Sequence, residues 1–377
     1  MSEPSEVLVS ESEVPLDGSD TSNDELAITT PFDTSKIRVE TKNTQMDTLI
    51  KRIKNAEIDL APSFQRRAGI WNDQAQSRLI ESMLIKIPLP AFYMDATVDD
   101  KWVVVDGLQR LTAIRRYVTD EELSLTGMEF LTDYNNIKFS KLPRGFRRRI
   151  EETDIVLYLI QPGTPSNVKF DIFRRINTGG EPLSAQEIRH ALNQGPVTAY
   201  LEKLAKSTPF LHATNNGISS KRMDDRECVL RFLAFTLTSP EDYRSDNLDQ
   251  YLHSIMSQFN KFDRQELDDY EKRFTSAMWL ASKIFERHAF RKCYNKDKAR
   301  HPINKALFEV VSVAFGKLNE EEASRILSQK DAVLDGTIQL FNEDKEFETA
   351  ISQGTGSIKR VIYRFCRFEN MIRTLLK

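Results

Sequence analysis

The chain has 377 residues, of which 40% are hydrophobic and 29% charged, a composition typical of a folded protein with room for two or three domains. No apolar run reaches the roughly 18 residues of a membrane span, and the N-terminus lacks a signal-peptide pattern, so we expect a cytoplasmic protein with no membrane partner. The three cysteines form no Cys-x-x-Cys pair, which argues against a disulfide framework or zinc knuckle. Each lies in a helical apolar pattern that predicts core packing (Cys228, Cys293 and Cys366).

The formal net charge of −3 is unevenly distributed. Residues 1–26 contain eight Asp and Glu and no Lys or Arg, so the rest of the chain carries +5. We expect residues 1–31 to form a disordered acidic tail, with order beginning near Phe32. A mildly basic body is compatible with a polyanionic partner, and equally with an ordinary solvated surface.

In chain order, apolar residues at helical spacing predict a first helix within Thr44–Asn55, and a short strand follows in "EIDLAP". Asn72 is expected to cap a second helix that stops before Pro88. "AFYMDA" and "WVVVDG" predict two strands, and a helix over Leu108–Val118 follows the second strand at once.

A basic segment, "LPRGFRRRIEE", precedes a predicted strand over Asp154–Gln161. Pro165 suits the start of the next helix, which ends in "INTGG", and Ser184 with Glu187 has the spacing of a capping box for another. From Pro196 onward nearly every segment has helical periodicity, and the longest such pattern predicts a helix over residues 263–290. The sequence therefore predicts an α+β domain over residues 32–195 followed by an all-α helical domain over 196–377.

The passage from strand to helix at Asp106-Gly107-Leu108-Gln109-Arg110 combines groups suited to phosphate. The first N–H groups of a helix attract anions, and Gly107 lets a ligand approach the backbone. The Arg110 fork matches two phosphate oxygens, Gln109 can hydrogen-bond a phosphate or position a water, and Asp106 can hold Mg²⁺. The alternative is an ordinary turn in which Asp106 caps the helix and the other side chains face water. The chain has no P-loop motif.

"VVDGLQRLTAI" resembles the Asp-Gly-Gln-Gln-Arg signature of the GmrSD-type restriction endonuclease N-terminal domain family, whose fold is similar to ParB and sulfiredoxin. The segments Phe64–Met94 and Phe170–Leu192 resemble the first and third blocks of that family, in the same order. One position departs from the signature, because Leu108 stands where the family has its first Gln. Leucine has no group that can hydrogen-bond phosphate or water.

The resemblance implies binding and hydrolysis of a nucleoside triphosphate with Mg²⁺, in DNA restriction or anti-phage defence. It implies catalytic roles for Asp106, Gln109 and Arg110, with Asp106 holding the metal. It also implies nucleotide-binding roles for six further residues (Gln65, Arg66, Gly107, Asn177, Thr178 and Gly179). From the residues alone, Gln65-Arg66 can equally be a surface pair that holds a loop, and the "NTGG" segment a helix C-cap.

The alternative function is a nucleotide-sensing or DNA-binding subunit that does not hydrolyse the nucleotide. The expected partners are DNA, a separately encoded nuclease and further copies of the chain.

Many relatives carry a His-Asn-His nuclease, but "ARHPINKALFEV" offers only His301 and Asn304 at the start of an apolar helix, which favours a capping or core role. His190, near the end of a predicted helix, is interpreted as a capping or packing residue.

Three Arg-rich patches (144–149, 287–300 and 359–367) fit either a DNA-backbone groove or solvated helical faces. In the second patch, Phe290 and Tyr294 could stack on bases.

Overall fold

The computed structural model describes residues 37–60, 71–176, 183–245, 247–298 and 300–377. The predicted acidic tail lies outside these residues. The chain divides into two compact units, which we call the N-terminal unit (Phe32–Leu192) and the C-terminal unit (from Asn193). Each unit is described by itself.

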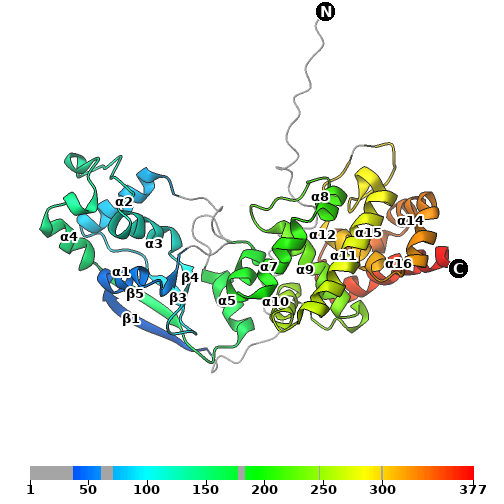
Figure 1. Ribbon diagram of the computed structural model, residues 1–377, viewed down its shortest axis with the longest axis horizontal. Coiled ribbons are helices and arrows are strands. Elements are labelled where there is room, and N and C mark those ends of the chain that lie inside the picture. The colour runs from blue at the N-terminus through cyan, green and yellow to red at the C-terminus, as the bar shows by residue number, and fades with distance from the viewer. Residues whose placement is uncertain (1–36, 61–70, 177–182, 246, 299) are drawn as a thin grey trace, which may run out of the picture. The chain divides into compact units, whose positions relative to one another are not determined.

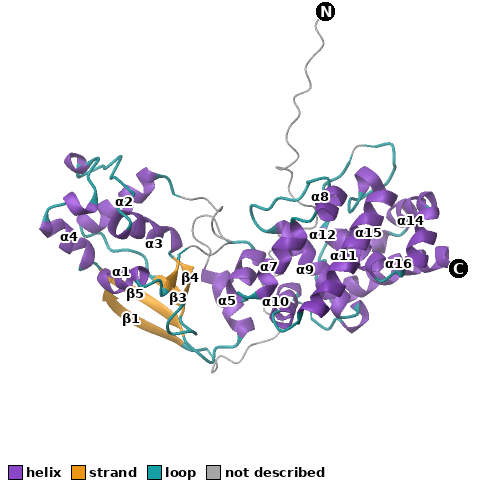
Figure 2. Cartoon of the chain, viewed as in Figure 1, coloured by secondary structure: helices purple, strands orange, loops and turns teal. Residues whose placement is uncertain are grey.

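The N-terminal unit is built on a mixed five-stranded sheet in the order β1-β5-β3-β4-β2 (Figures 1 and 2). The pairs β1–β5 and β3–β4 are antiparallel, whereas β5–β3 and β4–β2 are parallel. The strands span Val39–Gln45 (β1), Ile58–Asp59 (β2), Phe92–Asp95 (β3), Trp102–Asp106 (β4) and Asp154–Ile160 (β5).

Helices α1 to α4 supply apolar residues to one continuous core with the sheet. The helices of this unit span Met46–Lys54 (α1), Asp73–Leu84 (α2), Leu108–Ile114 (α3), Arg144–Glu151 (α4), Ser166–Ile176 (α5) and Ala185–Leu192 (α6). A π-helical turn, Arg115–Thr119, continues α3. Short 3-10 turns occur at Thr132–Tyr134 and Phe139–Lys141.

Local sequence signals explain where several of these elements begin. The Asn72 side chain accepts a hydrogen bond from the Ala75 N–H, which confirms the predicted cap of α2. Ser184 and Glu187 exchange the two bonds of the predicted capping box, at 2.6 and 3.1 Å. The stripe predicted for the first helix is buried on α1, because its members recur every three or four residues (Met46, Leu49, Ile50 and Ile53).

A buried carboxylate fixes the connector that follows α3. Glu81 of α2 is 3% exposed and accepts hydrogen bonds from the backbone N–H groups of Glu129, Phe130 and Leu131 at 2.8 to 3.0 Å. Burial acts to raise the pKa of Glu81, but these three bonds and the Arg78 charge outweigh it, and the pKa lies below its ordinary value. The connector is therefore tied to α2 by an ionised side chain.

The C-terminal unit is helical, and its described residues contain only one isolated β-bridge, between Arg291 and Ile303. Its helices span Pro196–Ala205 (α7), Thr208–Thr214 (α8), Asp224–Leu237 (α9), Leu248–Phe259 (α10), Arg264–Phe285 (α11), Lys305–Gly316 (α12), Glu320–Ser328 (α13), Lys330–Glu343 (α14), Lys345–Ser352 (α15) and Ile358–Leu376 (α16). A 3-10 turn at Pro240–Asp242 precedes α10. Every residue of α12 is buried, so this helix lies at the centre of the unit.

An ion network crosses that centre. Glu309 of α12 and Arg364 of α16 have side chains with 0% exposure and are paired, and Arg231 of α9 lies 3.2 Å from Glu309. The Arg364 guanidinium also donates to the Thr355 carbonyl at 2.7 Å. Because the buried charges are paired and hydrogen-bonded, the network fixes which helices meet.

Three features differ from the sequence-based expectations. The strand β1 was not predicted, since its residues are mostly exposed and it is held by pairing with β5. Cys366 is exposed rather than buried, because it lies off the apolar stripe of α16, whereas Cys228 and Cys293 are buried as predicted. The long helix α11 ends at Phe285, five residues earlier than its pattern suggested, and a 3-10 turn, Glu286–His288, follows. No described helix is long and apolar enough to cross a membrane.

Candidate functional site

The turn between β4 and α3 is shaped by a close approach of Gly107 to Phe92. Gly107 has φ +99° and is the N-cap of α3. A Cβ placed on it would lie 2.5 Å from Cδ1 of Phe92, a separation that a side chain could not tolerate. Glycine is therefore required here both by backbone conformation and by packing.

Arg110 is held inside the protein. Its guanidinium donates to the carbonyls of Pro90 and Ala91 and to Oδ2 of Asp106, the last two at 3.0 and 2.8 Å, and it lies 4.3 Å from the centre of the Phe92 ring. Its side chain is 10% exposed. Burial lowers the pKa of Arg110, and Asp106 opposes that effect. The fork that the sequence assigned to phosphate thus binds the chain's own oxygens and braces the start of β3 against the end of β4.

Asp106 is the more accessible partner of this pair, with a side chain that is 37% exposed. The alternative in which it caps α3 does not match the structure, because Gly107 is the N-cap and the carboxylate accepts its hydrogen bond from Arg110. Only Oδ2 takes part in that bond. A carboxylate with a second oxygen, at the exposed end of a strand, has the chemistry of a magnesium ligand.

Gln109 ties the turn to Trp71, which directly precedes the cap of α2. Its Oε1 accepts a hydrogen bond from the Trp71 backbone N–H at 3.2 Å. The side-chain amide nitrogen takes no part in that bond and can donate to a group on its other side. Leu108 beside it is partly buried against the apolar core. This packing gives a physical reason for an apolar residue at the position where the family signature has Gln.

Five of the predicted nucleotide-binding residues lie outside the described residues (Gln65, Arg66, Asn177, Thr178 and Gly179). Described residues of both blocks contact the elements of the turn. Trp71 bonds to Gln109, and α5, which ends at Ile176, packs against β4. The first block therefore borders the β4–α3 turn, and the third contacts the strand that leads into it.

Comparison with known proteins shows what this region is similar to. Residues 46–193 match the family model described as the GmrSD restriction endonuclease, N-terminal domain. We refer to the matched residues as the GmrSD-type domain on the strength of this similarity. No curated protein and no solved structure matches the chain. The name of the family connects the GmrSD-type domain with DNA restriction, and its fold is α+β as predicted.

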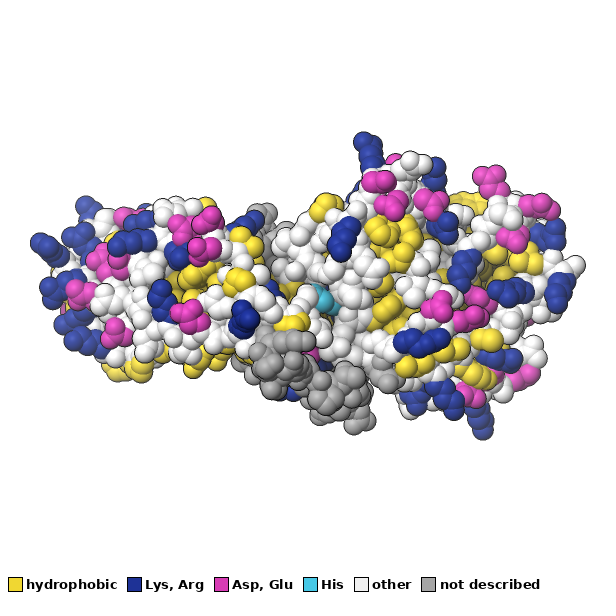
Figure 3. Space-filling model, turned by 90° about the horizontal axis from the view of Figure 1, so that it is seen from below, with side chains coloured by type: hydrophobic (Ala, Val, Ile, Leu, Met, Phe, Trp, Pro, Cys, Tyr) yellow, Lys and Arg dark blue, Asp and Glu magenta, His cyan; other side chains and the backbone are white. Residues whose placement is uncertain are grey.

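The GmrSD-type domain carries a strongly basic segment. Residues 138–150 contain six Lys and Arg and no Asp or Glu. In Figure 3 dark-blue side chains crowd the left-hand end of the view, the end at which Figure 1 places α4. Arg148 is 70% exposed there, whereas Arg149 donates to the Leu84 carbonyl. The segment has the charge of a surface for a polyanion.

The second basic patch, 287–300, does not offer its aromatic rings to nucleic acid. Phe290 is 1% exposed and packs against Phe308, and Tyr294 packs against Phe341 and donates to Glu348. The base-stacking role suggested for these rings was wrong, because both fill contacts within the C-terminal unit.

The nuclease-like segment is structural, as its sequence indicated. Asn304 has 0% exposure, its Oδ1 accepts the Leu307 N–H and caps α12, and its Nδ2 donates to the Ile351 carbonyl. His190 is 1% exposed, in agreement with a packing role. Over the described ranges, no group of three or more His, Cys, Asp and Glu is placed to hold a metal ion.

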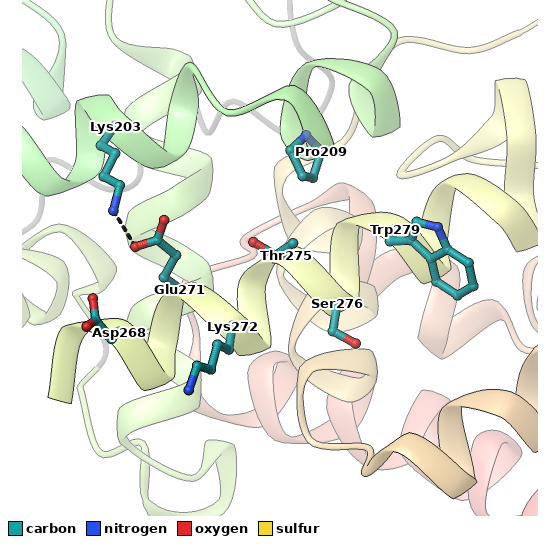
Figure 4. Close-up of a pocket in the computed structure, with 8 residues that line it drawn as sticks. All are labelled: Lys203, Pro209, Asp268, Glu271, Lys272, Thr275, Ser276 and Trp279. Carbon is teal, nitrogen blue, oxygen red and sulfur yellow. Dashed lines mark hydrogen bonds and ion pairs between the residues drawn. The ribbon is translucent and has the colours of Figure 1, made fainter. Parts of the chain in front are cut away.

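A groove of about 820 Å³ runs along α11 of the C-terminal unit (Figure 4). Lys203 of α7 reaches Glu271 at one end and Trp279, 48% exposed, stands at the other. The lining combines charges of both signs with Thr and Ser, and includes no His or Cys. It lacks a nucleophile with an adjacent base, so the β4–α3 turn remains the better candidate for chemistry.

Proposed function

We propose that the GmrSD-type domain binds a nucleoside triphosphate with Mg²⁺ at the β4–α3 turn and hydrolyses it in support of DNA restriction or anti-phage defence. The observation that carries the proposal is the exposed Asp106 carboxylate beside the start of α3, inside a region that matches the family. A ParB-like fold belongs to this proposal, as the family resemblance implies.

In this proposal the residues of the turn have separate tasks. Asp106 holds Mg²⁺, which takes its remaining ligands from phosphate oxygens and water. The first N–H groups of α3 and the Gln109 amide nitrogen donate to phosphate or to the attacking water. Arg110 acts through Asp106, because its three internal bonds fix that carboxylate and the start of β3.

The residues outside the described ranges complete the proposed site. The family resemblance assigns Gln65 and Arg66 to the phosphates and Asn177 to Gly179 to the nucleotide. Support comes from described neighbours, since Trp71 bonds to Gln109 and α5 packs against β4. These roles concern the phosphates and the metal, and they do not select a particular base.

A second candidate is a nucleotide sensor without turnover. Leu108 favours it, because a side chain packed against the core cannot position water. In either case the basic segment 138–150 would contact the DNA backbone, and a separately encoded nuclease would cut the DNA.

The test measures binding and phosphate release with a panel of nucleoside triphosphates and Mg²⁺ on the full chain. Asp106→Asn keeps an oxygen for Arg110 but removes the charge that Mg²⁺ needs, so we expect it to abolish release. Asp120→Asn is the matched control, since it makes the same change at a carboxylate that pairs with Arg115 on the surface. Binding with release supports the enzyme, and saturable binding without release supports the sensor. Absence of binding to every nucleotide would refute both.

A further inference from the structure

The loop between α11 and α12 encloses a cavity that the proposed function does not use. The cavity has a volume of about 160 Å³ and lies within the C-terminal unit. It is lined by His288, Lys292, Cys293, Tyr294, Asn295, Lys298 and His301. It shares no residue with the β4–α3 turn, so a ligand bound in it is independent of the proposed function.

The lining is cationic or neutral throughout. Two lysines and two histidines face the cavity together with an amide and a phenol, and none of the described lining residues is Asp or Glu. Burial raises the pKa of the Cys293 thiol, which keeps this side chain uncharged at neutral pH. An anion would therefore meet no negative charge on the walls.

The walls are held in place by the protein itself. Arg291 pairs with Ile303 through the backbone, and its guanidinium donates to the His301 carbonyl at 2.8 Å. On the opposite side, the Tyr294 hydroxyl donates to Glu348 of α15 at 2.7 Å, and the Tyr294 carbonyl accepts from Asn342 of α14 at 3.0 Å. A cavity fixed in this way loses little conformational entropy when a ligand binds.

His288 supplies an unsatisfied polar atom. The side chain is 6% exposed, and its Nε2 accepts a hydrogen bond from Nε of Arg287 at 3.2 Å, so the proton of the neutral ring is on Nδ1. This Nδ1 has no hydrogen-bond partner among the described residues. A buried nitrogen without a partner is unfavourable, and a ligand oxygen would remove that penalty. Burial lowers the pKa of His288, and the nearby positive charges of Arg287 and Arg291 lower it further.

We propose that this cavity binds one phosphate group, with Lys292 and Lys298 pairing its charge and Asn295 and His288 Nδ1 donating hydrogen bonds. The cavity is smaller than the roughly 300 Å³ at which pockets for whole small molecules begin, so it fits the phosphate and excludes a nucleoside. Donors from several directions suit a tetrahedral oxyanion. The group is either inorganic phosphate or the 5′-phosphate of a DNA end.

Calorimetric titration of the full chain with inorganic phosphate, at constant ionic strength, tests the proposal. Lys298→Gln removes a charge from the lining, and we expect it to weaken binding about tenfold. Lys296→Gln is the matched control, since it makes the same change on the same loop outside the lining, and we expect less than about a twofold effect. Equal affinity in the parent and both variants would overturn the proposal, as would no measurable binding to the parent.

The source of the phosphate is identified by a second titration. A DNA duplex with 5′-phosphates is compared with the same duplex carrying 5′-hydroxyls. A preference for the phosphorylated duplex that Lys298→Gln removes assigns the cavity to DNA ends, whereas phosphate binding without such a preference assigns it to the free ion. Asp106→Asn should leave both titrations unchanged, so failure of the nucleotide site can be told apart from failure here.

Discussion

Replacing Arg110 by methionine distinguishes a structural brace from a phosphate ligand. The substitution keeps an apolar stem over Phe92 but removes the three internal hydrogen bonds of the guanidinium. Two partly buried carbonyls, of Pro90 and Ala91, lose their donor, at about 1 kcal/mol each. The Asp106 pair adds less, because that carboxylate is 37% exposed and screened by water.

We therefore expect Arg110→Met to lower the free energy of unfolding of the N-terminal unit by about 2–3 kcal/mol. For a unit of this size, that corresponds to a melting temperature lower by roughly 5–10 °C. The chain has three tryptophans, and in a Trp279→Phe background the remaining two, Trp71 and Trp102, both lie in this unit. Their fluorescence during urea unfolding of the full chain reports on it selectively.

Arg115→Met is the control for Arg110→Met. The Arg115 side chain is 43% exposed and pairs with Asp120 at 2.9 Å on the surface, so its loss should change stability by less than about 1 kcal/mol. If Arg110→Met unfolds at the same urea concentration as its parent yet loses nucleotide binding, Arg110 contacts the ligand directly and the bracing role is refuted.

Three further predictions concern the same framework. Gly107→Ala should destabilise the N-terminal unit by about 2–3 kcal/mol, measured by the same unfolding assay, because alanine is strained at φ +99° and meets the Phe92 ring; an unchanged midpoint would contradict this. Glu81 has a lowered pKa, so its contribution is complete above the unfolded value of about 4.3 and declines as pH falls below it. Urea midpoints between pH 3 and 7 should therefore fall with acidification more steeply in the parent than in Glu81→Gln, and parallel profiles would count against the role of this carboxylate. Glu309→Gln leaves Arg364 buried without its counter-charge and should lower the stability of the C-terminal unit by about 3–5 kcal/mol, followed by Trp279 fluorescence, and a loss under about 1 kcal/mol would show that the network is dispensable.

Elements governed by short-range rules could be predicted from the sequence. The apolar stripe of α1, the Asn72 cap and the Ser184–Glu187 capping box each depend on residues within one or two helical turns, and the structure confirms all three. The strand–Asp–Gly–helix order at residue 106 is local in the same sense, and with its flanking blocks it carried the resemblance that the family match confirms.

Contacts between segments that are far apart in the sequence could not be predicted from local patterns. The strand β1 has a mostly exposed face and no apolar alternation, and it exists because β5, more than a hundred residues later, offers a full row of partners. Phe290 is part of a basic run by sequence but is buried by the helices around it.

The same division runs through the candidate site. The sequence by itself determined which residues stand at the turn, because a glycine between a strand and a helix and the polar groups after it are read from neighbouring positions. Only the tertiary structure decided where Arg110 directs its guanidinium, since its acceptors, the carbonyls of Pro90 and Ala91, reach it by strand pairing. A buried guanidinium takes the acceptors that the fold places around it, and two of them belong to the segment that leads into β3.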